Sequence, residues 1–172
     1  MGEGVIRMLR MGLEFVEERG DVGVVLGKED PRAFSAGANL ALILSLAQEG
    51  DWDELALAVR QFQKASMSLR YSPFPVVVAP FGLTLGGGAE FTLHADRVQT
   101  HAELYMGLVE AGVGLLPAGG GTKEMLLRFT QELAPYEEAD PFEAVKRAFQ
   151  LIAMARTSTS ALEARKMGLL RD

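Results

Sequence analysis

The sequence contains no cysteine, and it has only two histidines and one tryptophan among its 172 residues. Without cysteine there are no disulfide bonds and no thiolate chemistry, which is typical of intracellular proteins. No apolar run approaches the length of a membrane span, and the first residues, MGEGVIRMLR, lack the basic-then-apolar plan of a signal peptide. We therefore expect a cytoplasmic protein with no membrane span.

Positive charge is also scarce. The net charge is -6 and no long run of lysine and arginine occurs, so the clustered basic surface that nucleic acid requires is not expected. Hydrophobic residues make up 48% of the chain, enough for one globular domain with a sizeable core. We expect residues 1–172 to form that single domain.

Hydrophobic periodicity predicts alternating helices and strands. We expect helices over Glu3 to Glu18, Asp51 to Arg70, Gly88 to Ala95, Thr122 to Arg128, Pro141 to Ala155 and Ser160 to Met167. We expect one strand buried on both faces at Val22 to Gly27, a second buried strand at Val76 to Pro80, and short strands at RVQT and ELYM. This alternation predicts an α/β fold with a parallel sheet.

Two glycine-rich turns, AFSAGANL and LGGGAE, stand out between these elements. Three consecutive glycines cost conformational entropy and add little to a core, so the backbone there must come close to something. If both turns follow parallel strands, they lie at the same edge of the sheet, where α/β proteins bind ligands. Two N–H groups would then converge on one ligand oxygen, although two ordinary tight turns explain the composition equally well.

Other site types fit the sequence less well. The glycines around LGGGAE lack the spacing of a dinucleotide fingerprint, and GGGTKE lacks the residue order of a P-loop. Glu90 and His94 share a helix face, but two histidines without an acidic cluster make a metal site improbable. No GxSxG elbow is present, so a serine hydrolase is not indicated.

Three motifs in order, AFSAGANL, GLTLGGGAEFTLHAD and GLVEAGVGLLPAGGGTKE, with a weaker TSTSALEARKMGLL, resemble the crotonase, or enoyl-CoA hydratase/isomerase, superfamily. The resemblance spans about Val22 to Leu170, with an insertion near Thr130 to Pro141. It is closest to the hydratase part of bifunctional 3-hydroxyacyl-CoA dehydrogenases. It implies the ClpP/crotonase fold with repeated β-β-α units.

The resemblance also implies site residues. The two oxyanion-hole amides fall on Ala38 and Gly87, and the two catalytic glutamates on Glu90 and Glu110. The substrate would be an acyl-CoA thioester, with coenzyme A as part of the substrate and with no metal or separate cofactor. Its contacts would include four further residues, Phe34, Ala36, Gly37 and Gly86. Of these, Phe34 to Ala38 would lie at the nucleotide end of the pocket.

Three departures from the family pattern stand out, of which the two at the ends of the chain bear on activity and the third, Asn39, is minor. Relatives begin with strands before the first helix and end with helices that close the acyl-CoA site and build a trimer, so we expect this chain to be a fragment truncated at both ends. Asn39 replaces the usual aspartate, a change that leaves the amide of Ala38 in place.

The resemblance thus implies an enoyl-CoA hydratase of fatty-acid β-oxidation. An isomerase of the same fold, or an inactive acyl-CoA-binding module, are the alternatives. The expected partner is a further copy of the chain or a fused dehydrogenase domain.

Overall fold

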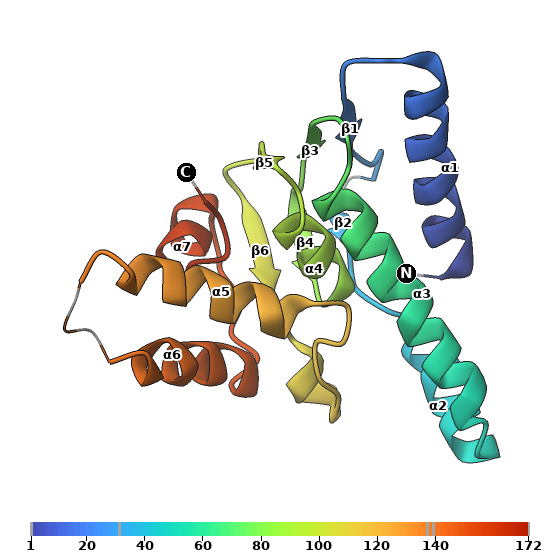
Figure 1. The fold of residues 1–172 in the computed structure, drawn as a ribbon. Helices are drawn as coiled ribbons and strands as arrows, with labels where there is room; N and C mark the ends of the chain where they lie inside the picture. The colour runs from blue at the N-terminus through green and yellow to red at the C-terminus, as the bar shows by residue number, and fades with distance from the viewer. Residues whose placement is uncertain (1, 31, 137, 139, 172) are drawn as a thin grey trace.

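The computed structural model describes residues 2–30, 32–136, 138 and 140–171. Its strands lie in the middle, with α1 and α3 on one side and α5, α6 and α7 on the other (Figure 1). The helices are α1 (Glu3–Arg19), α2 (Leu40–Glu49), α3 (Trp52–Arg70), α4 (Gly87–Leu93), η1 (Glu110–Val113, a 3-10 turn), α5 (Gly121–Leu133), α6 (Phe142–Ala153) and α7 (Ala161–Lys166). The strands are β1 (Val24–Leu26), β2 (Ala33–Ser35), β3 (Val76–Val78), β4 (Gly82–Leu85), β5 (Arg97–Val98) and β6 (Leu104–Gly107).

The strands form two parallel sheets, ordered β1-β3-β5 and β2-β4-β6. Along the chain, each strand of the first sheet is followed by one of the second and then by helices, so the same β-β-α unit recurs. The middle strands fix the registers, with Val25 opposite Val77 in one sheet and Thr84 opposite Met106 in the other. The predicted α/β fold with repeated β-β-α units is confirmed.

Helix predictions were most accurate where the chain carries a clear end signal. Helix α1 ends at Gly20, whose φ of 67° is easily adopted by glycine, and its Leu13 and Val16 are buried. Helix α3 begins after Asp51, whose side chain accepts a hydrogen bond from the N–H of Glu54. Helix α5 extends to Leu133, past the expected end of the helix. In the acidic insertion, residues 137 and 139 lie outside the described residues.

The expected burial of the first strand is wrong. Val25 in β1 is 69% exposed, because β1 is an edge strand of its sheet. The equivalent run in β3 fits the prediction better, since Val76 and Val78 are fully buried in the central strand. The two strands are similar in composition, VVL and VVV, but they differ in their positions in the sheet.

Strand β2 and helix α2 were not predicted from the sequence. Strand β2 has three residues, too few for a periodic pattern to appear. Helix α2 is apolar on several faces, and Leu40, Leu42 and Leu44 are exposed, so no single buried stripe marks it. The local signal is at its start, where the Asn39 side chain accepts a hydrogen bond from the N–H of Leu42 at 3.2 Å.

Two apolar cores meet at α4. One contains Leu93 with residues of β6, α5, α6 and α7, and the other contains Phe91 with residues of α1, α3 and β3. Every residue of α4 is buried as a result. The helix that carries Glu90 is therefore held on both sides by packed side chains.

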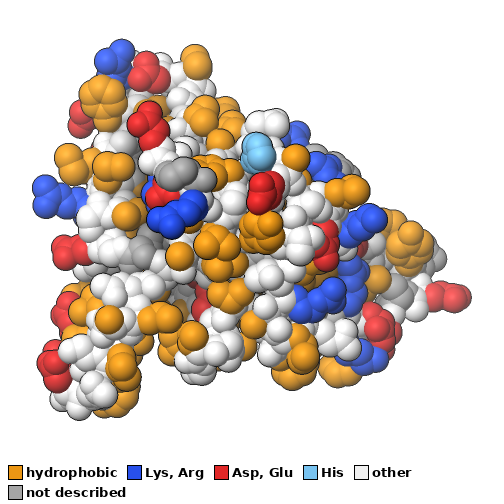
Figure 2. Space-filling view, turned by 180° about the vertical axis from the view of Figure 1, so that it is seen from behind, with side chains coloured by type: hydrophobic (Ala, Val, Ile, Leu, Met, Phe, Trp, Pro, Cys, Tyr) orange, Lys and Arg blue, Asp and Glu red, His pale blue; other side chains and the backbone are white. Residues whose placement is uncertain are grey.

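Apolar side chains also reach the surface, interspersed with charged ones, as Figure 2 shows for one face. Those on α1 include Val5, Met8, Met11 and Phe15. None of the helices in the described part of the chain is both long and apolar enough to cross a membrane.

Candidate active site

The two glycine-rich turns meet at one edge of the second sheet. They follow β2 and β4, which are paired in parallel, so the turns after Ser35 and Leu85 emerge side by side. A Cβ atom placed on Gly37 would lie 3.3 Å from the carbonyl oxygen of Leu85 and 3.7 Å from the amide nitrogen of Gly87. The two turns lie together as expected, but the strands that bring them together are β2 and β4, not the runs at Val22 and Val76.

The structure accounts for two of the three glycines in the triplet, Gly86 and Gly88. Gly86 has a φ of 53° and its N–H donates to the carbonyl of Gly107 at 2.9 Å, which turns the chain from β4 into α4. Gly88 lies against β2, where a Cβ atom would come within 2.5 Å of the Ser35 Cβ. A side chain is disfavoured at Gly86 by the backbone conformation, and at Gly88 by the lack of space beside Ser35.

Glu90 lies inside the protein with only 3% of its surface exposed. Its Oε1 accepts a hydrogen bond from the backbone N–H of Gly121 at 2.8 Å. Gly119 passes so close that a Cβ atom there would lie 2.6 Å from Glu90 Oε2. The second glycine cluster, Gly119 to Gly121, therefore forms a backbone cradle around this carboxyl group.

The environment of Glu90 favours its protonated form. Burial raises the pKa of Glu90 to about 7, and the charge of Glu110 acts in the same direction. Hydrogen bonds from the backbone of Gly119, Gly120 and Gly121 act against this rise by stabilising the carboxylate. A carboxyl group with a pKa near neutrality can both take up and release a proton at physiological pH.

Glu110 begins the 3-10 turn η1 and lies beside the glycine turns. A Cβ atom on Gly86 would be 3.1 Å from Glu110 Oε1 and 3.6 Å from the Cα of Gly37. Its Oε2 is buried and has no hydrogen-bond partner among the described residues. Burial raises the pKa of Glu110 as well. A charge fully surrounded by water would not show this shift, so Glu110 is more than a solvated loop residue.

The remaining predicted site residues lie around this junction with unequal exposure. Gly37, Gly86 and Gly87 are buried, whereas Ala36 and Ala38 are exposed. Phe34 is half-buried and packs against the core that contains Phe91. A substrate contact by Phe34 itself stays a prediction.

A metal at Glu90 and His94 finds no support. The His94 Nδ1 lies 2.7 Å from the backbone oxygen of Glu90 and does not contact its carboxyl group. In the described ranges, no three histidine, aspartate or glutamate side chains are close enough to hold a metal ion.

The sequence reasoning missed the cradle at Gly119 to Gly121. The order of residues in GGGTKE excludes a phosphate loop, and the family motif that contains it does not indicate which side chain these glycines surround. Missed too was a group of titratable side chains next to Glu90, in which His94 and Glu124 are buried and Lys123 and Arg70 are more accessible. No short motif marks it, because its members come from α3, α4 and α5.

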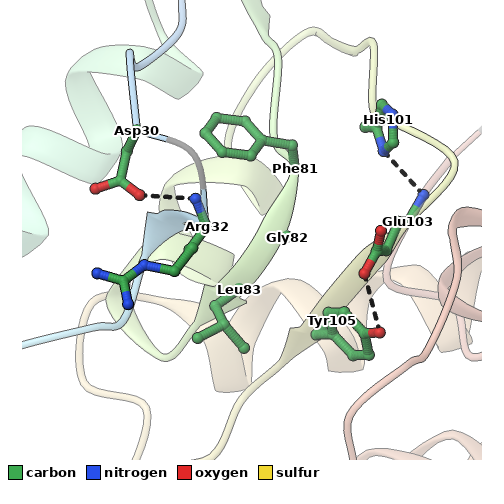
Figure 3. A pocket seen from close by; sticks show the side chains of 8 residues that line it. All are labelled: Asp30, Arg32, Phe81, Gly82, Leu83, His101, Glu103 and Tyr105. Atoms are coloured by element: carbon green, nitrogen blue, oxygen red, sulfur yellow. Dashed lines mark hydrogen bonds between the residues drawn. The ribbon is translucent and has the colours of Figure 1, made fainter.

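A pocket of about 500 Å³ lies at the other end of the second sheet. Figure 3 shows it between the segments that lead into β2, β4 and β6. Its polar groups bond to one another: Asp30 Oδ1 accepts from the N–H of Arg32 at 2.9 Å, and the Tyr105 hydroxyl donates to Glu103 Oε1 at 3.1 Å. None of the predicted site residues lines it.

Comparison with known proteins identifies the motifs at this junction. The model of the enoyl-CoA hydratase/isomerase family matches residues 1–137. A probable 3-hydroxyacyl-CoA dehydrogenase from Bacillus subtilis is 45% identical over the whole chain, which covers 21% of that protein. The alpha subunit of a fatty acid oxidation complex from Vibrio cholerae is 38% identical over 63% of the chain, or 15% of the subunit.

Solved structures of enoyl-CoA hydratases share the fold of this chain. The chain is similar to an enoyl-CoA hydratase from Bacillus anthracis with a TM-score of 0.79 and 26% identity, over 99% of the chain and 59% of the hydratase. A Geobacillus kaustophilus structure with a TM-score of 0.82 and 21% identity shares the fold over 99% of the chain and 58% of its own length. The chain thus spans little more than half of the solved hydratases, and about a fifth of the Bacillus subtilis dehydrogenase.

Proposed function

Because the chain belongs to the enoyl-CoA hydratase/isomerase family, we propose that it carries the catalytic centre of an enoyl-CoA hydratase. The reaction is the addition of water across the 2,3 double bond of an enoyl-CoA thioester. The observation that carries the proposal is the position of two carboxyl groups, the buried Glu90 and the half-buried Glu110, at the junction of two glycine turns.

The glycine turns supply the oxyanion hole. As water adds to the β-carbon, negative charge accumulates on the thioester oxygen, and fixed N–H donors stabilise that enolate more than the neutral substrate. The amides of Ala38 and Gly87 take this role. The first N–H groups of a helix have no intrahelical partner, which leaves the amide of Gly87, at the start of α4, able to donate to a ligand. Gly37 brings the turn that contains Ala38 close to the amide nitrogen of Gly87.

The glutamates divide the proton transfers. One removes a proton from the attacking water, and a proton is delivered to the α-carbon of the substrate. A pair of carboxyl groups with raised pKa values suits this because each can exist protonated or ionised near neutral pH. Both glutamates are therefore required for hydration, which favours a hydratase over an isomerase that needs one.

The product would be a 3-hydroxyacyl thioester. A dehydrogenase acting on such a compound is what the name of the Bacillus subtilis relative describes, and the chain covers only a fifth of that protein. We infer that the chain works as one part of a longer protein, with the dehydrogenase as its partner, or as a homo-oligomer.

The test is the loss of enoyl-thioester absorbance when the chain meets crotonyl-CoA. Glu90→Gln and Glu110→Gln are expected to lower turnover by at least about a hundredfold each. The exposed Glu103→Gln, at the far pocket, is the control and is expected to keep full turnover. A Glu90 or Glu110 variant that turns over like the unaltered chain would refute the assignment. Binding of acyl-CoA without turnover would instead identify a binding module.

A further inference from the structure

A group of titratable side chains lies next to Glu90, and two of its members are buried. His94 and Glu124 are both inaccessible to solvent. Lys123 Nζ lies 2.9 Å from Glu124 Oε1 and 3.4 Å from His94 Nε2, and an Arg70 nitrogen lies 3.9 Å from Glu124 Oε2. Buried charges are costly unless they are paired, so this group calls for a structural or functional reason.

The group contacts Glu90 through two backbone segments. The His94 Nδ1 lies 2.7 Å from the carbonyl oxygen of Glu90, one turn earlier in α4. The imidazole also lies against Gly120, where a Cβ atom would come within 2.7 Å of its Cε1. Glu124 donates its N–H to the carbonyl of Gly120 at 2.9 Å. His94 and Glu124 therefore both contact Gly120, and the next residue, Gly121, donates a hydrogen bond to the Glu90 carboxyl group.

The contacts specify one tautomer of His94. A carbonyl oxygen only accepts hydrogen bonds, so Nδ1 must carry the hydrogen. In the neutral ring Nε2 is then an acceptor, which suits the Lys123 ammonium. Burial lowers the pKa of His94, so the neutral ring is the form present at neutral pH. Burial alone would raise the pKa of Glu124, but Lys123, His94 and Arg70 outweigh this and lower it.

We propose that His94 is a positioning residue for Glu90: its Nδ1–H fixes the Glu90 backbone, and its Cε1 and Nε2 atoms, packed against Gly120, fix the cradle at Gly119 to Gly121. Burial, Lys123 and Arg70 favour the neutral ring, whereas the charge of Glu124 acts against them. The catalytic consequence of this arrangement rests on the proposed function of Glu90, whereas the effect on the Glu90 carboxyl group does not.

A matched pair of variants isolates the Nδ1 contact. His94→Asn places an amide N–H near the position of Nδ1, and His94→Gln places it near Nε2, one methylene further out. The first readout is the titration of the Glu90 carboxyl group. It is measured by 13C NMR on the full chain, labelled at the glutamate side-chain carboxyls. Glu90→Gln identifies the signal. We expect His94→Gln to move the titration midpoint of Glu90 by at least about half a pH unit. In His94→Asn the midpoint is expected to stay close to that of the unaltered chain.

The second readout is hydration of crotonyl-CoA. His94→Gln is expected to lower kcat by about ten- to a hundredfold with KM changed by less than about twofold, because substrate binding is untouched while the acid–base group is misplaced. An unchanged titration and an unchanged kcat in a folded His94→Gln variant would overturn the proposal. A shifted titration in a chain that hydrates nothing would instead refute the proposed function and leave the positioning role intact.

A third measurement needs no variant at position 94. The 15N chemical shifts of the two histidine ring nitrogens report the tautomer directly, and His101→Asn assigns the remaining histidine. A hydrogen on Nδ1 of His94 at neutral pH is the expected result. A hydrogen on Nε2 alone would overturn the proposal even if His94→Gln failed to fold.

Discussion

The Oε1 atom of Glu90 accepts a hydrogen bond from the backbone N–H of Gly121 at 2.8 Å, across 31 residues of sequence. The contact joins the first glycine triplet, which leads into α4, to the second, which leads into α5. Both triplets therefore serve one carboxyl group. The first brings Glu90 to the edge of the sheet, and the second closes around its side chain.

Gly121→Ala tests the cradle. A Cβ atom there would lie 2.8 Å from Leu108 Cδ2 and 3.0 Å from Glu90 Oε1, so the carboxyl group must move. We expect a loss of about 1–3 kcal/mol of stability from overpacking and a fall in crotonyl-CoA turnover of at least about tenfold. Chemical denaturation and steady-state kinetics measure the two effects.

Gly12→Ala is the control for that substitution. Gly12 lies within α1 with no atom within 4 Å of an added Cβ, so alanine should stabilise the chain by about 0.5–1 kcal/mol. If Gly121→Ala behaved like Gly12→Ala, the cradle would have no steric role.

The sequence predicted the residues at the junction better than the surroundings that hold them. Glu90, Glu110 and the first glycine triplet occur in short local motifs, and a parallel sheet brings the ends of such motifs together. The cradle at Gly119 to Gly121 and the charges around His94 depend on how α4 and α5 pack, which no local pattern encodes. The order of the strands within two separate sheets was likewise hidden, so Val25 was expected in the interior although it lies at an edge.

The stability of the chain should depend on pH through Glu90. The folded chain holds this proton with a pKa of about 7, against an ordinary value of 4.5. Between these values the folded state binds more protons than the unfolded state, so stability falls as pH rises, by about 3 kcal/mol in total above pH 7.

Glu90→Gln cannot ionise, and its side-chain oxygen can still accept from Gly121. The variant should therefore gain stability relative to the unaltered chain as pH rises from about 5 to about 8. Denaturant unfolding at several pH values measures the difference. The exposed Glu18→Gln controls for the loss of one negative charge. A pH-independent difference between Glu90→Gln and the unaltered chain would mean that the buried carboxyl does not carry this proton.

Ser158 ties the segment before α7 to the sheet that carries the site. Its buried hydroxyl accepts from the N–H of Met106 at 3.0 Å and donates to the carbonyl of Leu104 at 2.8 Å. Ser158→Ala leaves both β6 groups unpaired inside the protein, so we expect a loss of about 1–3 kcal/mol in denaturant unfolding. Ser45→Ala, in exposed α2, should change stability by less than about 0.5 kcal/mol. Equal effects of the two substitutions would contradict the role of Ser158.

Asn39 connects the stability of α2 to the oxyanion hole. Its side chain accepts from the N–H of Leu42, which fixes the start of the helix directly after Ala38. Asn39→Ala should cost α2 about 1 kcal/mol and raise amide hydrogen exchange in Leu40–Glu49. Asn39→Asp keeps an acceptor in the same place and should leave exchange unchanged. If the Ala38 amide stabilises the enolate, Asn39→Ala should also slow hydration more than Asn39→Asp. Faster exchange in α2 with hydration unaffected would remove Ala38 from the oxyanion hole and leave Asn39 as a helix cap alone.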